Sequence, residues 1–405
     1  MTTTINNEHK KLNVPNLRFP EFQGEWKRTI FKNVITLQRG SSPRPIIEYV
    51  TTSDDGVNWI KIGDMPHFGR IVTSTEEKIT KEGAKKSRQV NKGDLILSNS
   101  MSYGLPYIMG IDGYIHDGWF VLKNFENTFD KDYLCNLLIS RAIQNQYKRL
   151  AAGGVVQNIS SDLVNSVSVS IPTMMEQKKI SSLLNLIDER IATQNKIIED
   201  LKKLKSAIID YVINSLNTDF AKFGSLYEMA GEGGTPTTSN ASFYDNGKIP
   251  FIKIDDLKKK YLTENKDFIT ELGLQKSSAW LVPTHSILFS NGATIGEISI
   301  TTYPVCTKQG ILGIVPKQNI DVEFLYYFMS SSYFKKAVSR IVTEGTMKTA
   351  YLKDINNILC PIPTKEKQQE IAKMPSALNS KIDFEQSILK LFCSQKQYLL
   401  RQMFI

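Results

Sequence analysis

A glycine-rich stretch, Gly231-Glu-Gly-Gly-Thr235, is the first candidate for chemistry in this sequence. Phosphate-binding loops need glycines because backbone N–H groups must approach the ligand closely. Such a loop ends in Gly-Lys-Ser/Thr and opens a helix, whereas Pro236 and Thr237 follow here. A second stretch of this kind, Gly40-Ser-Ser-Pro43, has fewer glycines. Turns are therefore favoured over a nucleotide site at both places.

Two groups of carboxylates with a lysine have the residue types of a metal-dependent nuclease, in which acidic groups hold Mg²⁺ near the phosphate. They are Asp255 or Asp256 with Glu264-x-Lys266, and Glu21 with Glu25-x-Lys27. Neither group recurs elsewhere in the chain, so solvated surface charge is favoured and an autonomous DNA nuclease is the weaker alternative. The sequence also lacks motifs of serine hydrolases, zinc proteases and adenine methyltransferases. We expect no catalytic residue, metal site or cofactor in this chain.

Polar and basic side chains in loops form a third group, and their chemistry suits DNA. Arginine and lysine neutralise phosphates or bind base edges, and asparagine and serine hydrogen-bond to either. Loops of this kind occur in the same order in both halves of the chain. The candidate DNA-binding residues are Arg39, Ser41, Ser42, Arg44, Lys61, Lys85, Lys86, Arg88, Asn99, Ser102, Tyr103, Thr235, Thr237, Lys253, Lys258, Lys259, Lys260, Tyr261, Asn291 and Thr294.

The net charge is only weakly basic. The 405 residues include 50 Lys and Arg against 41 Asp and Glu, which gives +9. This excess is spread thinly along the chain, so charge alone does not identify a polyanionic partner. No apolar run reaches the ~18 residues of a membrane span, and the N-terminus has no signal-peptide core. We expect a cytoplasmic protein with no membrane partner.

The sequence is a tandem duplication. Trp59-Ile-Lys-Ile-Gly-Asp64 matches Phe251-Ile-Lys-Ile-Asp-Asp256, and Leu95-Ile-Leu-Ser-Asn99 matches Ile287-Leu-Phe-Ser-Asn291, both at an offset of 192 residues. Further along, Ile171-Pro-Thr173 matches Ile362-Pro-Thr364 at an offset of 191. An ordered series of matches at nearly one offset indicates two copies of one structural unit.

Each copy begins with short apolar, β-branched runs between Gly, Pro, Asn and Ser, a pattern typical of strands and loops. The expected strands are Val57–Ile62, Asp94–Ser98 and Ser166–Ile171, then Ile249–Ile254, Ser286–Ser290 and Ile311–Val315. Amphipathic stretches at Tyr133–Leu150 and Phe324–Val342 have helical periodicity. The expected fold class is α+β, with a strand-rich mixed domain duplicated in tandem.

A long helix is expected after each mixed domain. Apolar residues step by four and three positions alternately, which is the heptad pattern of a coiled coil. The expected helix-packing residues are Ile180, Leu184, Ile187, Ile191, Ile198, Leu201, Ile371, Leu378, Ile382, Leu389 and Phe392. Gln194 and Lys205 interrupt the pattern at the same places as their counterparts Glu385 and Lys396, so polar layers would fix the register of an antiparallel pair.

Two details concern the ends and interior of these helices. Thr173-Met-Met-Glu176 fits a capping box, in which the threonine hydroxyl and the glutamate each satisfy a free backbone N–H. Pro375 occupies the position of Leu184 and has no backbone donor, so it should kink the second helix or make it restart. The expected boundaries are 1–172 and 217–363 for the mixed domains, with helices at 173–216 and 364–405.

The whole pattern resembles the specificity subunits of type I restriction–modification systems. The motifs that carry the resemblance are Gly233-x-Thr-Pro236, hydrophobic-Ile-Lys-x-x-Asp at 59–64 and 251–256, Phe289-Ser-Asn-Gly-Ala-Thr-Ile-Gly296, and Ile-Pro-x-x-x-x-Gln-x-x-Ile before each long helix. The resemblance covers nearly the whole chain, from about Leu17 to Phe404. The first copy departs from the pattern with Ser42-Pro43 in place of Thr-Pro.

The resemblance implies two target-recognition domains, each binding one half of a split, asymmetric DNA sequence through the major groove. The two helices would set the spacer and dock two methyltransferase subunits, which methylate adenine with S-adenosylmethionine. Restriction subunits would join them and use ATP and Mg²⁺ to translocate and cleave DNA. This chain itself would be non-catalytic.

Helix length agrees with this arrangement. A helix of ~40 residues is ~60 Å long, which is enough to hold two modules one turn of DNA, ~34 Å, apart. The main alternative is a duplicated coiled-coil scaffold that binds protein or glycan partners, and the weak charge excess of the second mixed domain favours it.

Overall fold

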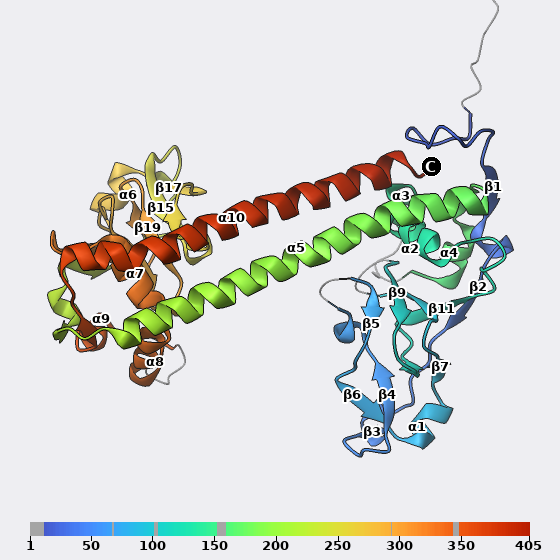
Figure 1. The fold of residues 1–405 in the computed structure, drawn as a ribbon, viewed down its shortest axis with the longest axis horizontal. Helices are drawn as coiled ribbons and strands as arrows, with labels where there is room; N and C mark the ends of the chain where they lie inside the picture. Colours follow the sequence, from blue (N-terminus) through green and yellow to red (C-terminus); the bar gives the residue numbers. More distant parts are fainter. Residues whose placement is uncertain (1–11, 67–68, 101–103, 152–158, 293, 343–347) are drawn as a thin grey trace, which may run out of the picture. The chain divides into compact units, whose positions relative to one another are not determined.

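The computed structural model divides the chain into two units, each containing one copy of the duplicated sequence (Figure 1). Unit 1 comprises Met1–Lys196 and Ser387–Ile405, and unit 2 comprises Ile197–Gln386. The structure describes residues 12–66, 69–100, 104–151, 159–292, 294–342 and 348–405. Across these ranges no helix combines the length and the apolar character needed to cross a membrane.

Unit 1 is built on a five-stranded mixed sheet in the order β2-β11-β8-β9-β5. Its strands are β2 (Thr36–Arg39), β11 (Trp119–Lys123), β8 (Leu95–Ser98), β9 (Pro106–Met109) and β5 (Ile71–Val72). A second sheet contains β3 (Val50–Thr51), β6 (Glu77–Ile79), β4 (Val57–Ile60), β10 (Gly113–Ile115) and β7 (Arg88–Val90), and a third pairs β1 (Lys27–Ile30) with β12 (Ser168–Ile171). The short helices are α1 (Lys81–Lys85), α2 (Lys131–Ile139), α3 (Arg141–Ala151) and α4 (Ser161–Ser166).

Unit 2 repeats this topology except in its second sheet, which has three strands in place of five. Its five-stranded sheet has the order β14 (Tyr227–Glu232), β21 (Ile311–Pro316), β18 (Ile287–Ser290), β19 (Ile298–Thr301) and β16 (Tyr261–Leu262). The other sheets are β17 (Asp267–Ile269), β15 (Ile249–Ile252) and β20 (Cys306–Thr307), and β13 (Phe220–Lys222) with β22 (Leu359–Pro361). The helices are α6 (Glu271–Gln275), α7 (Val322–Ser330), α8 (Ser332–Ile341) and α9 (Leu352–Ile355). The expected duplication and α+β fold class are confirmed.

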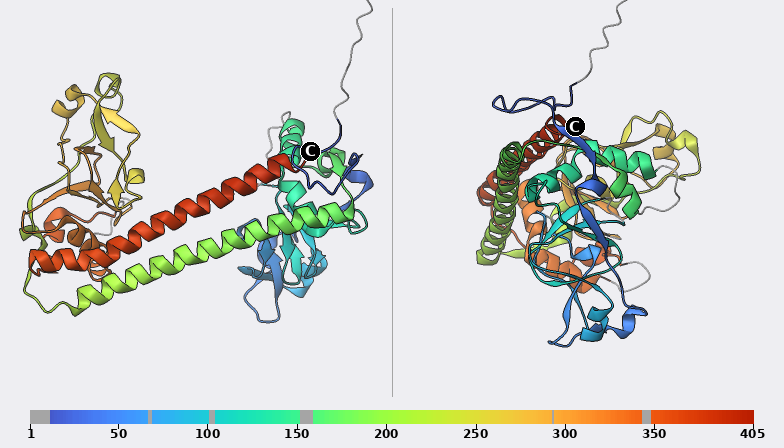
Figure 2. Two further views of the ribbon diagram at one scale, coloured as in Figure 1. Left: turned by 45° about the horizontal axis from the view of Figure 1, so that its top comes forward. Right: turned by 90° about the vertical axis from the view of Figure 1, so that its right-hand side faces the viewer.

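The five-stranded sheet is buried on both faces, which explains its continuous apolar strands. In β8, Leu95 and Leu97 pack into the core that includes α2 and α3, whereas Ile96 packs into the core under the second sheet. In β18, Ile287 and Phe289 occupy the helix side and Leu288 the opposite side. Figure 2 shows the second sheet of each unit on the side away from the long helices.

Each amphipathic stretch expected as one helix is two helices. The breaks fall at Ser140 and Ser331, which have extended backbone conformations. The hydroxyl of Ser331 accepts a hydrogen bond from the N–H of Phe334 at 3.3 Å, and Ser140 accepts one from Ile143 at 3.4 Å. Serine at these positions caps the following helix, because its side chain satisfies a donor that has no partner within the helix. Apolar periodicity alone did not reveal these caps.

The long helices are α5 (Met174–Ser215) and α10 (Lys365–Gln402), and each unit contains part of both. In unit 1, Leu399 and Leu400 of α10 join the same core as Ile180 and Leu184 of α5. All the expected helix-packing residues are buried or partly buried: Ile180, Leu184, Ile187, Ile191, Ile198, Leu201, Ile371, Leu378, Ile382, Leu389 and Phe392. The seam therefore faces protein in both units.

The expected restart at Pro375 is wrong, because α10 is continuous from Lys365 to Gln402. Pro375 is buried, like Ala372 one turn before it. Packing of the neighbouring turns holds the helix together although one backbone donor is missing. The capping box is half correct. Thr173 accepts from the N–H of Glu176 at 3.3 Å, but the Glu176 carboxylate binds Arg18 at 2.8 Å.

A buried glutamine fastens the start of each long helix to its mixed domain. In unit 1 the carbonyl oxygen of the Gln177 side chain accepts from the N–H of Asp130 at 2.9 Å. Its amide donates to the backbone oxygens of Thr128 at 2.9 Å and Pro172 at 3.1 Å. Gln177 thus joins α5 to the segment that opens α2.

Gln368 makes the same three hydrogen bonds in unit 2. Its partners are the N–H of Asp321 at 2.8 Å and the backbone oxygens of Asn319 at 3.3 Å and Pro363 at 2.9 Å. Both glutamines are buried, so these bonds satisfy backbone groups that water does not reach. The glutamine of the Ile-Pro-x-x-x-x-Gln motif is therefore a structural connector.

We predict that Gln368→Ala lowers the free energy of unfolding by about 1–3 kcal/mol, because three buried backbone groups lose their partner. Urea denaturation followed by circular dichroism measures this change. Gln369→Ala is the matched control, since Gln369 is exposed on the next position of α10, and it should change stability by less than about 0.5 kcal/mol. Equal effects of the two substitutions would contradict the connector role.

Candidate nucleic-acid interface

A glycine positions the first loop in both units. The N–H of Gly40 donates to the backbone oxygen of Trp119 at 2.8 Å, and Gly233 donates to that of Ile311 at 2.9 Å. A Cβ atom on Gly40 would lie 2.0 Å from the backbone oxygen of His116, and one on Gly233 would lie 2.2 Å from that of Thr307. Only glycine allows this approach, which explains the Gly-x-Thr-Pro motif better than phosphate binding does.

The hydroxyl residue of the same motif holds the facing loop. Ser42 accepts from the N–H of Asp117 at 3.3 Å, and Thr235 accepts from the N–H of Gln309 at 3.2 Å. We call this pair of loops, residues 39–44 with 116–118 in unit 1 and 232–237 with 308–310 in unit 2, the recognition frame. The hydrogen bonds of the glycine and of the hydroxyl residue are equivalent in the two units, although the exposed side chains of the frame differ.

The two asparagines that we expected on the DNA-binding surface lie in the interior. Asn99 is 4% exposed and Asn291 is 1% exposed. The Asn99 amide donates to the backbone oxygen of Asp117 at 2.9 Å, and that of Asn291 donates to Ala350 at 3.3 Å. Their backbone N–H groups bind Gly118 and Gly310 at equivalent positions. These asparagines bind the recognition frame from the interior of the domain, and their side chains do not reach the surface.

The Ile-Lys-x-x-Asp motif forms a short turn with a balanced charge. The carboxylate of Asp64 accepts from the backbone N–H of Lys61 at 2.6 Å, and Asp256 accepts from that of Lys253 at 2.9 Å. The lysine side chains pair with acidic residues of the neighbouring strand, at 2.6 Å to Glu77 in unit 1 and 2.9 Å to Asp267 in unit 2. The hydrogen bond that Lys61 donates to Glu77 raises the pKa of Lys61 despite its partial burial.

Three exposed arginines of unit 1 are linked by hydrogen bonds, and two of them contact Asp117. Arg44 binds the Asp117 carboxylate at 3.0 Å, and Arg39 donates to the Asp117 backbone oxygen at 3.2 Å. Arg88 donates to the backbone oxygen of Arg39 at 3.1 Å. The hydroxyl of Ser42 completes the group at 2.9 Å from the carboxylate. We call Arg39, Arg44 and Arg88 the arginine cluster.

The charges of this cluster are well defined at neutral pH. Burial alone would raise the pKa of Asp117, but the Ser42 hydrogen bond, a backbone hydrogen bond and the Arg44 charge hold it below its usual range. Burial lowers the pKa of His116 from its usual 6.5, against the opposing effect of Asp117. Asp117 is therefore an anion, His116 is neutral, and the three arginines keep an excess of positive charge.

A groove of about 1280 Å³ lies beside the arginine cluster in unit 1. Arg44, Lys61 and His116 line it together with Trp59 and Ile47. Lys85, the last residue of α1, and Lys86 directly after it are exposed, and Lys86 binds the Tyr49 hydroxyl at 2.5 Å. Ser41 is partly exposed in the frame. Ser102 and Tyr103 lie outside the described residues.

In unit 2 the candidate residues gather at two places. Thr235 and Thr237 belong to the recognition frame, and the backbone oxygen of Thr294 accepts from the Ser290 hydroxyl; Thr237 and Thr294 are exposed. Lys258 and Lys259 line a small hollow of about 280 Å³. Asp255, Asp256, Glu264 and Lys266, the residues of the nuclease alternative, line the same hollow.

The carboxylates of this hollow do not form a metal site. Asp256 is engaged by the backbone of Lys253, and Glu264 is 83% exposed and pairs with Lys259 at 3.4 Å. Among the residues that the structure describes, no group of three or more His, Cys, Asp or Glu could hold a metal ion. Solvated surface charge remains the better interpretation of Glu264 and Lys266.

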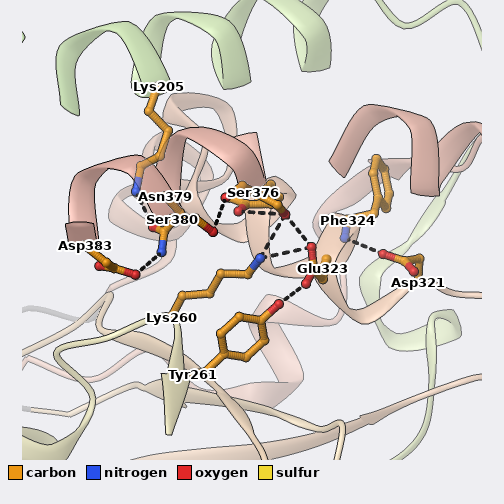
Figure 3. A network of polar contacts seen from close by, with 11 residues as sticks. Lys205, Lys260, Tyr261, Asp321, Glu323, Phe324, Ser376, Asn379, Ser380 and Asp383 are labelled. Atoms are coloured by element: carbon orange, nitrogen blue, oxygen red, sulfur yellow. Dashed lines mark hydrogen bonds and ion pairs between the residues drawn. The ribbon is translucent and has the colours of Figure 1, made fainter. Parts of the chain in front are cut away.

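Lys260 and Tyr261 were expected to contact DNA, but Lys260 is buried against the long helix α10 (Figure 3). Its ammonium group, with a side chain 2% exposed, lies 3.0 Å from Glu323 and 2.9 Å from the Ser376 hydroxyl. It also lies 4.7 Å from the centre of the Tyr261 ring. The hydroxyl of Tyr261 binds Glu323 in turn. Lys260 is thus a structural residue, and its assignment to DNA binding is wrong.

Arg70 has the equivalent role in unit 1. The backbone oxygens of Arg70 and Lys260 accept from Ile108 and Ile300 at the same edge of the sheet. Arg70 binds Asp188 of α5 at 3.0 Å, and Lys396 of α10 binds the same carboxylate. A cation therefore joins the sheet edge to the long helices in both units. The equivalence of Arg70 and Lys260 is not visible in the sequence. The two residues differ in type and are 190 residues apart, whereas the neighbouring matches between the two copies have an offset of 192.

Comparisons with known proteins give the family. Residues 24–203 and 217–391 match the family model of the type I restriction modification DNA specificity domain. The chain is 23% identical over 388 residues to the MjaIX specificity subunit of Methanocaldococcus jannaschii, covering 88% of each protein. It is 24% identical over 255 residues to the EcoR124I/EcoR124II specificity subunit of Escherichia coli, covering 60% of this chain and 61% of that one.

Solved structures share the fold. The S subunit of a type I restriction–modification system from M. genitalium has a TM-score of 0.55 at 17% identity, with 97% of this chain and 99% of that chain covered. A chain from a type I R-M system studied for its complex assembly has a TM-score of 0.61 at 16% identity, with 93% and 96% covered. Two specificity domains, each followed by a long helix, define a DNA-recognition subunit. The chain belongs to the type I restriction–modification specificity subunits.

We predict that Lys260→Met lowers the free energy of unfolding by about 2–3 kcal/mol. This is less than the 3–5 kcal/mol typical of a fully buried pair, because Glu323 retains some contact with water. Chemical denaturation measures the change. The matched control is Lys259→Met at the exposed neighbouring position, which should leave stability unchanged. A stable Lys260→Met protein with weakened DNA binding would restore the original assignment.

Proposed function

We propose that this chain recognises an asymmetric, bipartite DNA target, with one half bound by each mixed domain. The observation that carries the proposal is the recognition frame, in which the hydrogen bonds of the glycine and of the hydroxyl residue are equivalent in the two units. The exposed residues on that frame differ, with Arg39 and Arg44 in unit 1 where Glu232 and Thr237 stand in unit 2. One scaffold with two sets of side chains suits two different half-sites.

The proposed DNA-binding residues are those that the structure leaves at the surface of each unit. Arginine and lysine can bind guanine or phosphate, and serine and threonine can bind either. The set retained from the sequence is Arg39, Ser41, Ser42, Arg44, Lys61, Lys85, Lys86, Arg88, Thr235, Thr237, Lys253, Lys258, Lys259, Tyr261 and Thr294. Modest positive charge is compatible with a subunit whose partners also contact the DNA.

The long helices are the proposed docking surface for two methyltransferase subunits. Exposed apolar residues recur at heptad spacing along each helix, at Ile197, Leu204 and Tyr211 on α5 and at Phe384, Leu391 and Tyr398 on α10. Such stripes on a helix that already buries its other face suit a further protein partner. The domain boundaries used for this proposal are 1–172, 173–216, 217–363 and 364–405.

In this proposal the chain has no catalytic activity of its own. The methyltransferase subunits supply S-adenosylmethionine chemistry, and restriction subunits use ATP and Mg²⁺. The complex acts on double-stranded DNA in the cytoplasm. Each half-site is set by one mixed domain of this chain, and chemistry is carried out by the other subunits.

Methylome sequencing of DNA modified by the chain with its methyltransferase partner tests the proposal. We predict methyladenine at one split, asymmetric motif. Replacing residues 1–172 by those of a relative should change one half of the motif and leave the other half intact. The parent chain, processed in parallel, is the control. Absence of a methylated motif, or a change in both halves after the exchange, would contradict the two-domain model.

We predict that the double variant Glu264→Ala/Lys266→Ala leaves DNA cleavage by the complete complex unchanged within about twofold. The physical reason is that both side chains are solvated and Glu264 pairs only with Lys259. Cleavage of an unmethylated plasmid with one target measures the effect. If cleavage is abolished while methylation at the same target persists, the chain contributes to the nuclease site.

A further inference from the structure

The exposed residues of the recognition frame differ between the two units. The residues around the arginine cluster in unit 1 have other residue types at the equivalent positions of unit 2. Strand register places Arg39 opposite Phe120 and Glu232 opposite Leu312, so these two residues are equivalent. Asp117 and Gln309 are equivalent because each donates its N–H to the hydroxyl of Ser42 or Thr235. Unit 2 thus has Glu232 and Gln309 where unit 1 has Arg39 and Asp117.

Arg44 is the member of the cluster best placed to contact a base. One guanidinium nitrogen is held by Asp117 at 3.0 Å, yet the side chain is 80% exposed. The anchored nitrogen fixes the direction of the side chain, while the other donors remain open to a ligand. A guanidinium that presents two parallel donors matches the O6 and N7 acceptors of guanine in the major groove.

Asp117 has the geometry of a positioning residue for this arginine. Its carboxylate is shared by Arg44 and by the Ser42 hydroxyl, and Ser42 in turn binds the Asp117 backbone N–H. Its backbone oxygen accepts from both Arg39 and Asn99. The buried Asn99 therefore fixes Asp117 from the interior, and Asp117 fixes Arg44 at the surface. Preorganisation of this kind reduces the entropy lost when the side chain binds.

We propose that Arg44, positioned by Asp117, recognises a guanine in the half-site bound by unit 1. This inference rests on the proposed function, and it specifies one base of the target and the residue that selects that base. Unit 2 has Thr237 at the equivalent position, so its half-site is recognised by other contacts. A phosphate contact is the competing role for an exposed arginine, and it differs because it carries no base preference.

The test is methylome sequencing with the full complex, comparing rates at the wild-type motif and at motifs with one base changed. We predict that Arg44→Ala reduces discrimination at one G·C position of the unit 1 half-site by about tenfold or more, which is the range of one bidentate contact. The other half of the motif should be unaffected. Asp117→Asn should relax the same position less, because it removes the charge and keeps the hydrogen bond with Ser42.

Two further variants address charge and folding. Arg28→Ala is the matched control, since Arg28 is an exposed arginine on β1 of the same unit that binds Ser168, and it should leave base preference unchanged. Arg44→Thr with Asp117→Gln places the unit 2 residues on the same backbone frame. This double variant should fold with an unchanged thermal midpoint and lose the guanine preference.

The possible outcomes separate the inference from the proposed function. If Arg44→Ala weakens methylation equally at all related sequences, Arg44 contacts a phosphate and the inference is overturned, while the two-domain model stands. A change in the unit 2 half-site would likewise overturn it. If the wild-type complex yields no split motif, the proposed function itself fails.

Discussion

The structure of each unit depends on one glutamine side-chain amide, which makes the hydrogen bonds that buried backbone groups cannot make with water. Gln177 and Gln368 each bind one N–H and two carbonyl groups where a strand, a short helix and a long helix meet. Glutamine suits this place because it is uncharged and is both donor and acceptor. A glutamate would lack the donors, and an apolar residue would leave three groups unsatisfied. The mixed domain and its helix segments are therefore one body in each unit.

Rigidity in the interior allows variation at the surface. Glycine at 40 and 233, and a hydroxyl at 42 and 235, preserve the same loop geometry in both units. The side chains that project from these loops differ and make their own bonds to the backbone: Arg39 donates to the oxygen of Asp117 in unit 1, and Glu232 accepts from the N–H of Gly310 in unit 2. The cations at the sheet edge also differ, since Arg70 and Lys260 join equivalent elements through different partners. Duplicated domains can thus diverge in specificity without any change of fold.

Much of the fold could be predicted from the sequence, and the site only in part. The offset between copies predicted two similar units, and apolar periodicity predicted the six expected strands and the seam of the long helices. Asp117 was missed because its partners Arg39, Arg44 and Asn99 lie 18 to 78 residues away and no local pattern marks the pairing. Asn99, Asn291 and Lys260 were misplaced because a polar side chain in a loop motif can equally be satisfied inside. The break at Ser140 was not predicted, because the helical periodicity of apolar residues continues from α2 into α3.

The end of α10 has a consequence for how the chain is made. Leu399, Leu400, Met403 and Phe404 complete the core of unit 1, and the backbone of Leu17 binds that of Gln402 at 3.0 Å. Unit 2, in contrast, is formed by one continuous stretch, Ile197–Gln386. During synthesis the second copy has all its residues before the first copy can close its core. The core of unit 1 therefore cannot be complete until the last turns of α10 have been synthesised.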